Sequence, residues 1–390
     1  MRSNSAMTAL KAMLPSAAQT GASTPLLPSP AVRFAKPDYD AIVVGAGQAG
    51  LAAGYFLSRA GLRFTLLDAN ENVGAAWRNR WDSLRLFTPT RYNALPGLKF
   101  PGPSYALPGK DDVADYLALY ARQFRLPIKL GTTVSSLYRE GGRYVVRTSD
   151  GRSLTAAAVI VATGANQQPH VPAFAPRMAS HIVQMHSSDY RRPERLPQGK
   201  VLVVGAGNSG VQIAIELAHA GRQVVLSGRD TGSLPRQFLG RDIYDWLWPT
   251  LMRPSVQSLI GRRLMQGRLF SGDPLIGVPA NMISRRGVSR TGRIVGAKGG
   301  LALVEGGSVV TGVSAIVWCT GFRPDYSWLE LPALGLDGYP SHRRGIAQGV
   351  AGLAFLGMRF QYRMGSALLG GVGEDAAYVV DQIAAHVRAQ

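Results

Sequence analysis

The same four segments follow one another at two places in the chain. They are a short apolar run, a glycine-rich turn, a longer stretch of mixed polarity and a second apolar run. The first copy spans residues 40–67 and the second spans residues 200–226. Short apolar runs bounded by glycine predict buried strands, and the mixed stretches that end near residues 60 and 219 predict helices. Each copy therefore predicts two parallel strands joined by a helix.

A further apolar run follows each copy, at residues 158–164 and 315–321, and both runs end in Thr-Gly. A turn precedes each run, at Asp150-Gly151 and at Gly306-Gly307, and predicts a small antiparallel insertion. The whole pattern predicts an α/β protein with two Rossmann-like, three-layer dinucleotide-binding domains.

The repeat also sets the expected domain boundaries. Residues 38–165 and 315–390 are assigned to the first domain, which a strand and a helix near the C-terminus complete. Residues 166–314 are assigned to the second domain, with an insertion at about residues 234–290 that is expected to act as a substrate lid.

The N-terminal segment, residues 1–37, differs from the rest in composition. It is rich in Ser, Ala, Thr and Pro and has no acidic residue before Asp38. This composition predicts a disordered leader, and an organelle-targeting segment is the less favoured alternative.

The chain is strongly basic, with 43 Lys and Arg against 24 Asp and Glu and a formal net charge of +19. The basic residues are dispersed singly or in pairs, so we expect no specific nucleic-acid site. The apolar runs are all shorter than the roughly 20 residues of a membrane span, which predicts a soluble, cytoplasmic protein. Peripheral membrane contact is a less favoured alternative.

The cysteine and histidine content limits the chemistry. The single cysteine, Cys319, excludes an intrachain disulfide, a dithiol redox centre and a thiolate metal cage. The six histidines form no convincing metal-ligand pattern, so we expect no metal.

The two glycine-rich turns share the spacing Gly-x-Gly-x-x-Gly. A single match is weak evidence in a chain with 46 glycines, but both matches follow a predicted strand and open a predicted helix. In that context the first glycine permits the tight turn, the second lets a pyrophosphate approach the backbone, and the third lets helix and strand pack closely. The helix N-terminus then faces the phosphates.

The residues after the second strand of each copy suggest different ligands. Asp68 ends the second strand of the first copy, where a carboxylate accepts hydrogen bonds from a ribose diol, as in FAD or NAD. Ser227 and Arg229 occupy the corresponding place in the second copy and favour the 2′-phosphate of NADPH. Asp230 could instead pair with Arg229 or restore some use of NADH.

Taken together, the motifs resemble those of class B flavin-dependent monooxygenases, close to bacterial flavin-containing monooxygenases and plant YUCCA-type enzymes. The resemblance covers about residues 38–383 and includes Gly74-Ala75-Ala76-Trp77 and the linker His186-Ser187-Ser188-Asp189-Tyr190. It implies that NADPH reduces bound FAD and that O₂ adds at flavin C4a. The resulting hydroperoxide then transfers one oxygen atom to a small organic substrate.

The turns and the resemblance together give a set of candidate cofactor-binding residues. They are Gly45, Gly47, Gln48, Ala49, Gly50, Asp68, Trp77, Val134, Thr163, Gly164, Gly205, Gly207, Asn208, Ser209, Gly210, Ser227, Arg229, Thr320 and Gly321. The resemblance also places Phe87 and Thr88 in the flavin and oxygen pocket, as candidate catalytic residues. Phe87 stands where the flavin-containing monooxygenases have an Asn, and the first half of the family motif ahead of His186 is absent.

These departures keep two alternatives open: an NADPH-dependent flavin reductase or oxidase that releases H₂O₂, and a non-catalytic nucleotide-sensing or nucleic-acid-binding module. His186 is expected to be structural rather than a cofactor ligand.

The aromatic and arginine-rich part of the insertion, residues 242–269, predicts a lid over an apolar channel, a dimer face or a membrane-touching helix. Its arginines favour an acidic substrate such as an indole or phenyl carboxylate.

Overall fold

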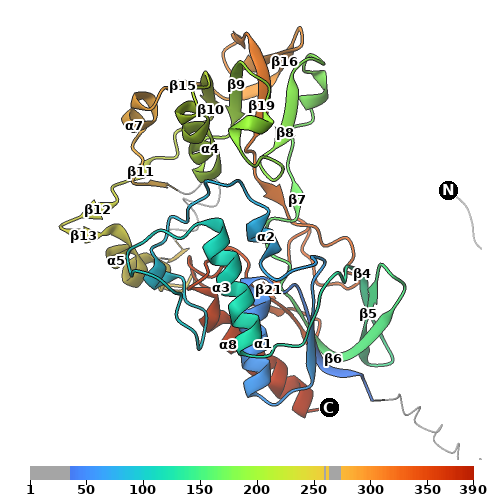
Figure 1. Cartoon of the computed structure of the whole chain (residues 1–390). Helices are drawn as coiled ribbons and strands as arrows, with labels where there is room; N and C mark the ends of the chain where they lie inside the picture. The colour runs from blue at the N-terminus through green and yellow to red at the C-terminus, as the bar shows by residue number, and fades with distance from the viewer. Residues whose placement is uncertain (1–35, 259–260, 263–273) are drawn as a thin grey trace, which may run out of the picture. The chain divides into compact units, whose positions relative to one another are not determined.

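The computed structural model describes residues 36–258, 261–262 and 274–390 (Figure 1). The predicted leader at residues 1–37 lies outside these residues except for its last two positions. Within the described residues, two parallel sheets form the centres of two domains.

The first domain is built on a sheet whose five central strands run parallel. Their order is β3, β2, β1, β6 and β23, and Ala41 of β1 pairs with Phe64 on one side and Ala158 on the other. The strands are β1 (Tyr39–Val44), β2 (Phe64–Leu67), β3 (Ile128–Lys129), β6 (Ser153–Val161) and β23 (Leu353–Phe355).

Alternate residues of β1 face opposite sides of this sheet, as the two-residue period of a strand requires. Ala41 and Val43 pack toward helices α1 (Gln48–Arg59), α3 (Lys110–Gln123) and α8 (Val372–Arg388), which lie together in Figure 1. Ile42 and Val44 pack toward the hairpin β4 (Val134–Glu140) and β5 (Arg143–Thr148) and toward the segment 326–334. Both faces are therefore covered, which gives the first domain its three layers.

The second domain repeats this plan. Its sheet has the order β15, β10, β9, β19, β8, and all pairs are parallel. These strands are β8 (Val183–His186), β9 (Lys200–Val204), β10 (Val224–Ser227), β15 (Val288–Thr291) and β19 (Val313–Trp318). Helices α4 (Asn208–His219) and α7 (Ala280–Arg285) pack beside it, and the antiparallel strands β16 (Ile294–Lys298), β17 (Leu301–Val304) and β18 (Val309–Val310) cover the other face.

Two short strands connect the domains. β7 (Gln168–Pro169) leads into the second domain and β20 (Phe322–Arg323) leads back, and the two pair antiparallel. We call this pair the neck. The expected boundary between residues 314 and 315 is wrong, because β19 pairs with β8 and β9 and thus belongs wholly to the second domain. The boundary lies after Trp318.

The insertion of the second domain runs from the end of β10 to the start of β15. It contains β11 (Ser233–Leu234), β12 (Gln237–Phe238), β13 (Arg241–Asp242), α5 (Ile243–Leu247), the π-helix η4 (Trp248–Met252) and β14 (Leu275–Ile276). Part of the aromatic and arginine-rich stretch predicted there, residues 259–260 and 263–273, lies outside the described residues. The remaining elements are α2 (Ala75–Arg78), η1 (Thr90–Tyr92), η2 (Ala175–Arg177), η3 (Pro193–Arg195), β21 (His342–Arg343) and β22 (Ile346–Ala347).

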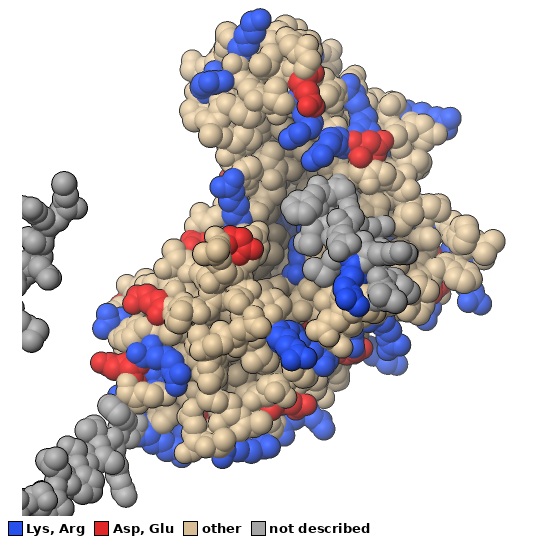
Figure 2. Space-filling model, turned by 180° about the vertical axis from the view of Figure 1, so that it is seen from behind, with Lys and Arg blue, Asp and Glu red and all other residues tan. Residues whose placement is uncertain are grey.

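Charged side chains are dispersed over the one face of the molecule that Figure 2 draws. On the face in Figure 2, basic side chains lie among acidic and neutral ones rather than in one continuous patch. No helix of the described part of the chain is long and apolar enough to span a bilayer.

Candidate functional site

The two glycine turns have the same geometry in both domains. Gly45 and Gly205 have φ angles of +106° and +115°, in the region that favours glycine. A Cβ at Gly50 would collide with the carbonyl oxygen of Gly45, and one at Gly210 with that of Gly205. The first glycine of each turn therefore sets the backbone direction, and the third lets the helix approach the strand.

The second glycine of each turn leaves space. A Cβ built at Gly47 or Gly207 would meet no atom of the described residues within 4 Å. Each of these glycines is the N-cap of a twelve-residue helix, α1 or α4, whose first N–H groups have no intrahelical acceptor. The two open turns therefore fit the pyrophosphates of two dinucleotides.

Asp68 lies at the carboxyl end of β2, beside the first glycine turn. Its Oδ2 accepts a 2.7 Å hydrogen bond from the backbone N–H of Ala46, and its Oδ1 accepts from the backbone and side chain of Asn70. These bonds hold the carboxylate at the turn, where an adenosine ribose would lie. The amide of Thr132 donates to Asp68 O, which brings the start of β4 at Val134 to the same end of the sheet.

The corresponding end of β10 holds basic residues. Arg229 is exposed, and no hydrogen bond or ion pair with a described residue engages it. Asp230 pairs with Arg290 of β15 at 3.5 Å. The structure thus brings a second arginine to this end of the sheet, which the sequence analysis missed because Arg290 lies on a strand that comes much later in the chain.

Ser227 does not present its hydroxyl to a ligand. It is fully buried, donates a 2.8 Å hydrogen bond to Gly292 O and accepts a 3.1 Å hydrogen bond from Ile294 N. The expectation that its hydroxyl binds a phosphate is wrong, because both hydrogen-bonding roles are used to hold the loop between β15 and β16.

Gln48 connects the first glycine turn to two other segments. Its side-chain oxygen accepts a 3.3 Å hydrogen bond from the indole N–H of Trp77, and its side-chain nitrogen donates at 3.0 Å to Ala367 O. Its neighbour Ala49 is buried, whereas in the second turn Asn208 is partly buried and Ser209 is exposed.

The Thr-Gly pairs that close each repeat lie at the neck. Thr163 Oγ1 and Gly164 O both accept hydrogen bonds of 2.7 Å from the Gln167 side chain. Thr320 Oγ1 donates to His170 O, and Gly321 O accepts from His170 N at 2.9 Å. Thr320 and Gly321 thus hold the two crossing segments together, whereas the bonds of Thr163 and Gly164 stay within the first of these segments.

His186 and Cys319 both support the second domain. The Nε2 atom of His186 lies 3.0 Å from Gly321 O, and burial lowers the pKa of its imidazole. Burial also raises the pKa of the Cys319 thiol to about 12, so the thiol stays protonated. Within the described residues, His, Cys, Asp and Glu form no group of three that could hold a metal ion.

An apolar cavity of about 100 Å³ lies between the domains. Asn208 of the second glycine turn lines it, and so does Ala367, whose carbonyl accepts the hydrogen bond from Gln48 of the first turn. The other lining residues are Phe87, Leu234, Tyr244, Leu247, Leu251, Met252, Pro274, Ile276, Arg359, Phe360, Met364 and Leu368. The cavity therefore joins the neighbourhoods of both glycine turns, and its walls suit an apolar molecule.

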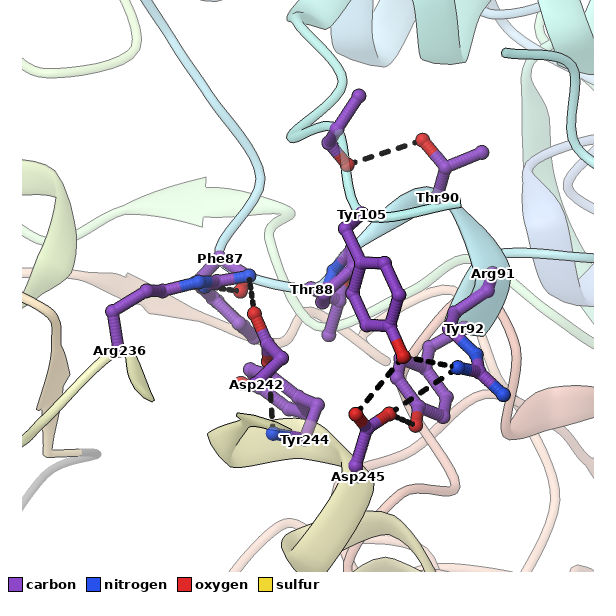
Figure 3. Close-up of polar contacts among 12 residues, drawn as sticks. Phe87, Thr88, Thr90, Arg91, Tyr92, Tyr105, Arg236, Asp242, Tyr244 and Asp245 are labelled. Atoms are coloured by element: carbon purple, nitrogen blue, oxygen red, sulfur yellow. Dashed lines mark hydrogen bonds and ion pairs between the residues drawn. The ribbon is translucent and has the colours of Figure 1, made fainter. Parts of the chain in front are cut away.

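Phe87 forms part of one wall of this cavity. Its ring stacks on that of Tyr244 with 6.4 Å between centroids and 16° between planes. Its carbonyl accepts a 2.6 Å hydrogen bond from Arg236, as Figure 3 shows.

Thr88 does not line the cavity. It is buried, and its hydroxyl donates a 2.6 Å hydrogen bond to Oδ1 of Asn93. The Asn93 amide in turn donates to the carbonyls of Thr88 and Pro89. Thr88 and Asn93 therefore shape the turn that follows Phe87, and the side-chain amide of Asn93 is used within the protein.

The loop before α8 packs closely against this turn. A Cβ at Gly370 would collide with Tyr92 O, and one at Gly371 with Gly365 O. Small residues before α8 thus allow its N-terminus to approach the cavity wall.

The comparisons with known proteins agree with this arrangement. Residues 42–260 match the family described as pyridine nucleotide-disulphide oxidoreductase. The uncharacterized oxidoreductase CzcO-like of Geobacillus kaustophilus is 40% identical over 354 residues, which cover 89% of this chain and 99% of that protein. Indole-3-pyruvate monooxygenase YUCCA1 of Oryza sativa is 36% identical over 204 residues, 51% of this chain and 50% of that enzyme.

A solved structure shares the two-domain plan. The flavin-containing monooxygenase from Stenotrophomonas maltophilia superposes with a TM-score of 0.73 at 29% identity, over 89% of this chain and 98% of that one. The agreement extends over both domains and the neck.

Proposed function

Because the chain belongs to the pyridine nucleotide-disulphide oxidoreductase family and to the class B flavin-dependent monooxygenases, we propose that it uses FAD, NADPH and O₂ to oxygenate a small apolar substrate. The balanced reaction consumes one NADPH, one proton and one O₂. It yields NADP⁺, water and the substrate with one added oxygen atom. Disulfide chemistry does not fit, because the chain has one cysteine and its thiol is protonated.

One observation carries this proposal: an apolar cavity is lined by Asn208 of the second glycine turn and by Ala367, whose carbonyl accepts a hydrogen bond from Gln48 of the first turn. In this arrangement the first turn and Asp68 would hold FAD, while the second turn and Arg229, with Arg290 nearby, would hold NADPH. When bound, the flavin accepts hydride and activates O₂. The protein orients the two cofactors and keeps water away from the reacting atoms.

The cavity lining indicates the kind of substrate. Among the described lining residues, most side chains are aliphatic or aromatic, and Asn208 and Arg359 are the clearly polar ones. A compact apolar molecule fits such walls, and one polar or anionic group on it would lie near these two side chains.

The test is a stoichiometry measurement. The protein is reconstituted with FAD and supplied with NADPH, ¹⁸O₂ and a panel of probes: methyl phenyl sulfide, a cyclic ketone and an aryl 2-oxo acid. We expect one probe to take up ¹⁸O with nearly one product per NADPH and little H₂O₂. If the protein fails to bind FAD or to oxidise NADPH, the enzyme function is rejected in favour of the non-catalytic module.

A second candidate function is an NADPH oxidase that converts O₂ to H₂O₂. It is favoured by the engaged amide of Asn93 and by Phe87 in the cavity wall, because neither side chain would offer a hydrogen-bond donor beside a bound flavin. In the same experiment this function would give one H₂O₂ per NADPH and no ¹⁸O in any probe.

A further inference from the structure

The insertion belongs to the second domain in sequence but is fastened to a loop of the first domain. Figure 3 shows the contacts between the insertion and the loop 87–105. The fastened element is α5, a helix of only five residues. So short a helix is marginal by itself, so its position depends on what holds it.

One set of contacts fixes the start of α5. Arg236 donates to Phe87 O at 2.6 Å and forms an ion pair with Asp242 at 2.8 Å. Asp242 is also the N-cap of α5 and accepts a 2.9 Å hydrogen bond from Tyr244 N. The start of the helix is therefore linked to the backbone of Phe87.

A second set of contacts surrounds Asp245, in the middle of α5. Its Oδ1 accepts a hydrogen bond from Tyr92, and its Oδ2 accepts one from Tyr105 at 3.0 Å. Arg91 donates to the Tyr105 hydroxyl at 2.6 Å and lies 3.5 Å from Oδ1 of Asp245. We call Asp245, Tyr92, Tyr105 and Arg91 the Asp245 cluster.

The Asp245 cluster engages both oxygens of one carboxylate. The Asp245 side chain is 12% exposed, whereas the Tyr105 residue is 52% exposed. Burial alone would raise the pKa of Asp245, but the bonds from Tyr92 and Tyr105 and the charges of Arg91 and Arg241 outweigh it, so this pKa lies below its ordinary value. The carboxylate therefore stays ionised and bonded at neutral pH.

Tyr244, the neighbour of Asp245, forms part of the cavity wall. It is 2% exposed, stacks on Phe87 and lies 6.1 Å from the Tyr92 ring between centroids. Leu247, also on α5, lines the same cavity. The position of α5 thus decides whether the wall formed by Phe87 and Tyr244 is complete.

We propose that Asp245 is a positioning residue: by holding α5 on the loop 87–105, it keeps Tyr244 against Phe87 and closes the cavity to water. The consequence for catalysis rests on the proposed function, since a closed cavity favours oxygen transfer over loss of H₂O₂. The structural part, that Asp245 holds α5, does not depend on any bound cofactor.

The first experiment measures hydrogen exchange of the backbone in the full chain, with and without FAD. In Asp245→Ala we expect peptides that cover residues 243–247 to exchange about tenfold faster, because two hydrogen bonds to a charged group are lost. Asp245→Asn should show a smaller increase, since its amide oxygen still accepts from one tyrosine. The control is Asp150→Asn, which removes an exposed ion pair with Arg152 in the hairpin after β5.

The second experiment measures H₂O₂ released per NADPH, with methyl phenyl sulfide as the probe. We expect a several-fold larger H₂O₂ fraction in Asp245→Ala and in the Tyr92→Phe, Tyr105→Phe double variant than in Asp150→Asn. Unchanged exchange at residues 243–247 in Asp245→Ala would overturn the proposal. If wild type makes only H₂O₂, the oxygenase function fails, and hydrogen exchange alone then decides the role of Asp245.

Discussion

At the scale of single residues, we propose that the side chains at the end of β10 decide which reduced coenzyme the protein uses. Arg229 is exposed there without a partner among the described residues, and Asp230 is drawn toward Arg290 instead. The alternative that Asp230 neutralises Arg229 therefore has no support in the contacts. An unpaired guanidinium beside a second arginine suits a phosphate dianion.

Replacing Arg229 with Ala should raise the KM for NADPH roughly tenfold to a hundredfold and leave the KM for NADH nearly unchanged, because NADH lacks the 2′-phosphate. Steady-state kinetics with both coenzymes measure this. Arg290→Ala should also raise the KM for NADPH, but by less, because the ion pair with Asp230 already partly neutralises Arg290. Equal changes for NADPH and NADH would remove the assignment of NADPH.

A pH dependence follows from His342 in β21. Its Nδ1 accepts a 3.1 Å hydrogen bond from Gly345 N, and burial lowers the pKa of the ring below its ordinary value of 6.5. The folded chain thus resists protonation while the unfolded chain takes up a proton as the pH falls through about 6.5. Stability is present above this pH and is lost below it, by up to about 1.4 kcal/mol per pH unit from this group.

His342→Asn keeps an acceptor near the position of Nδ1 and removes the titration. We expect its free energy of unfolding to fall less than that of wild type between pH 7.5 and pH 5.5, as measured by urea denaturation. The other buried histidines titrate alike in both proteins and cancel in the difference. If the free energy of unfolding falls equally in the two proteins over this pH range, His342 does not contribute to the pH dependence of stability.

At the scale of elements, the glycine turns and their helices carry the strongest prediction. A Cβ at Gly47 or Gly207 meets no described atom within 4 Å, so a larger side chain there would extend into the space left for a pyrophosphate. Gly47→Leu should yield a folded protein that fails to retain FAD. Gly207→Leu should stay yellow but be reduced by NADPH at least tenfold more slowly.

Absorbance at the flavin band after gel filtration, followed by anaerobic mixing with NADPH, separates these two outcomes. Circular dichroism of both variants serves as the folding control. Loss of FAD from both variants would contradict the division of cofactors between the domains.

The sequence predicted these elements well because their signals are local. The copy expected at residues 40–67 contains β1, α1 and β2, and the copy expected at residues 200–226 contains β9, α4 and β10. The helices expected to end near residues 60 and 219 are α1 and α4. The family resemblance is confirmed by the matching family and relatives. Ser227 was misassigned because its spacing from the turn does not reveal that its hydroxyl faces the loop before β16.

The elements of the insertion could not be placed from sequence. The Asp245 cluster joins residues about 150 positions apart, and no local period connects Tyr92 with Asp245. The wrong boundary at residue 315 has a similar cause, since only sheet pairing shows which domain β19 completes.

At the scale of the whole molecule, the two domains are joined by side-chain contacts as well as by the neck. Gln212 of α4 donates to Arg85 O at 3.0 Å and accepts from Arg85 N at 3.2 Å, so it bonds the loop that leads to Phe87. Asp82 N also donates to Arg191 O at 2.8 Å. The helix that opens at the second glycine turn is thus coupled to the cavity wall.

Gln212→Leu should slow the reduction of bound FAD by NADPH several-fold without loss of FAD. Without the bonds to Arg85, the N-terminus of α4 is no longer held at a fixed distance from Phe87. The cost of Gln212→Leu in stability should be roughly 1 kcal/mol for two neutral hydrogen bonds. Stopped-flow absorbance measures the first effect and urea denaturation the second. Gln223→Leu, at an exposed position of the same domain, is the control, and an equal reduction rate in both variants would contradict this coupling.

Pro169 and Phe322 pair directly, so the chain leaves and re-enters the first domain at almost one point. A segment whose two ends are neighbours can be replaced as a unit, a cassette, because the path of the remaining chain does not have to change. Such a cassette, residues 170–321, carries the arginines at the end of β10 together with Tyr244 and Leu247. Moving this segment into a relative would therefore transfer the proposed nucleotide preference and part of the apolar cavity wall in a single step.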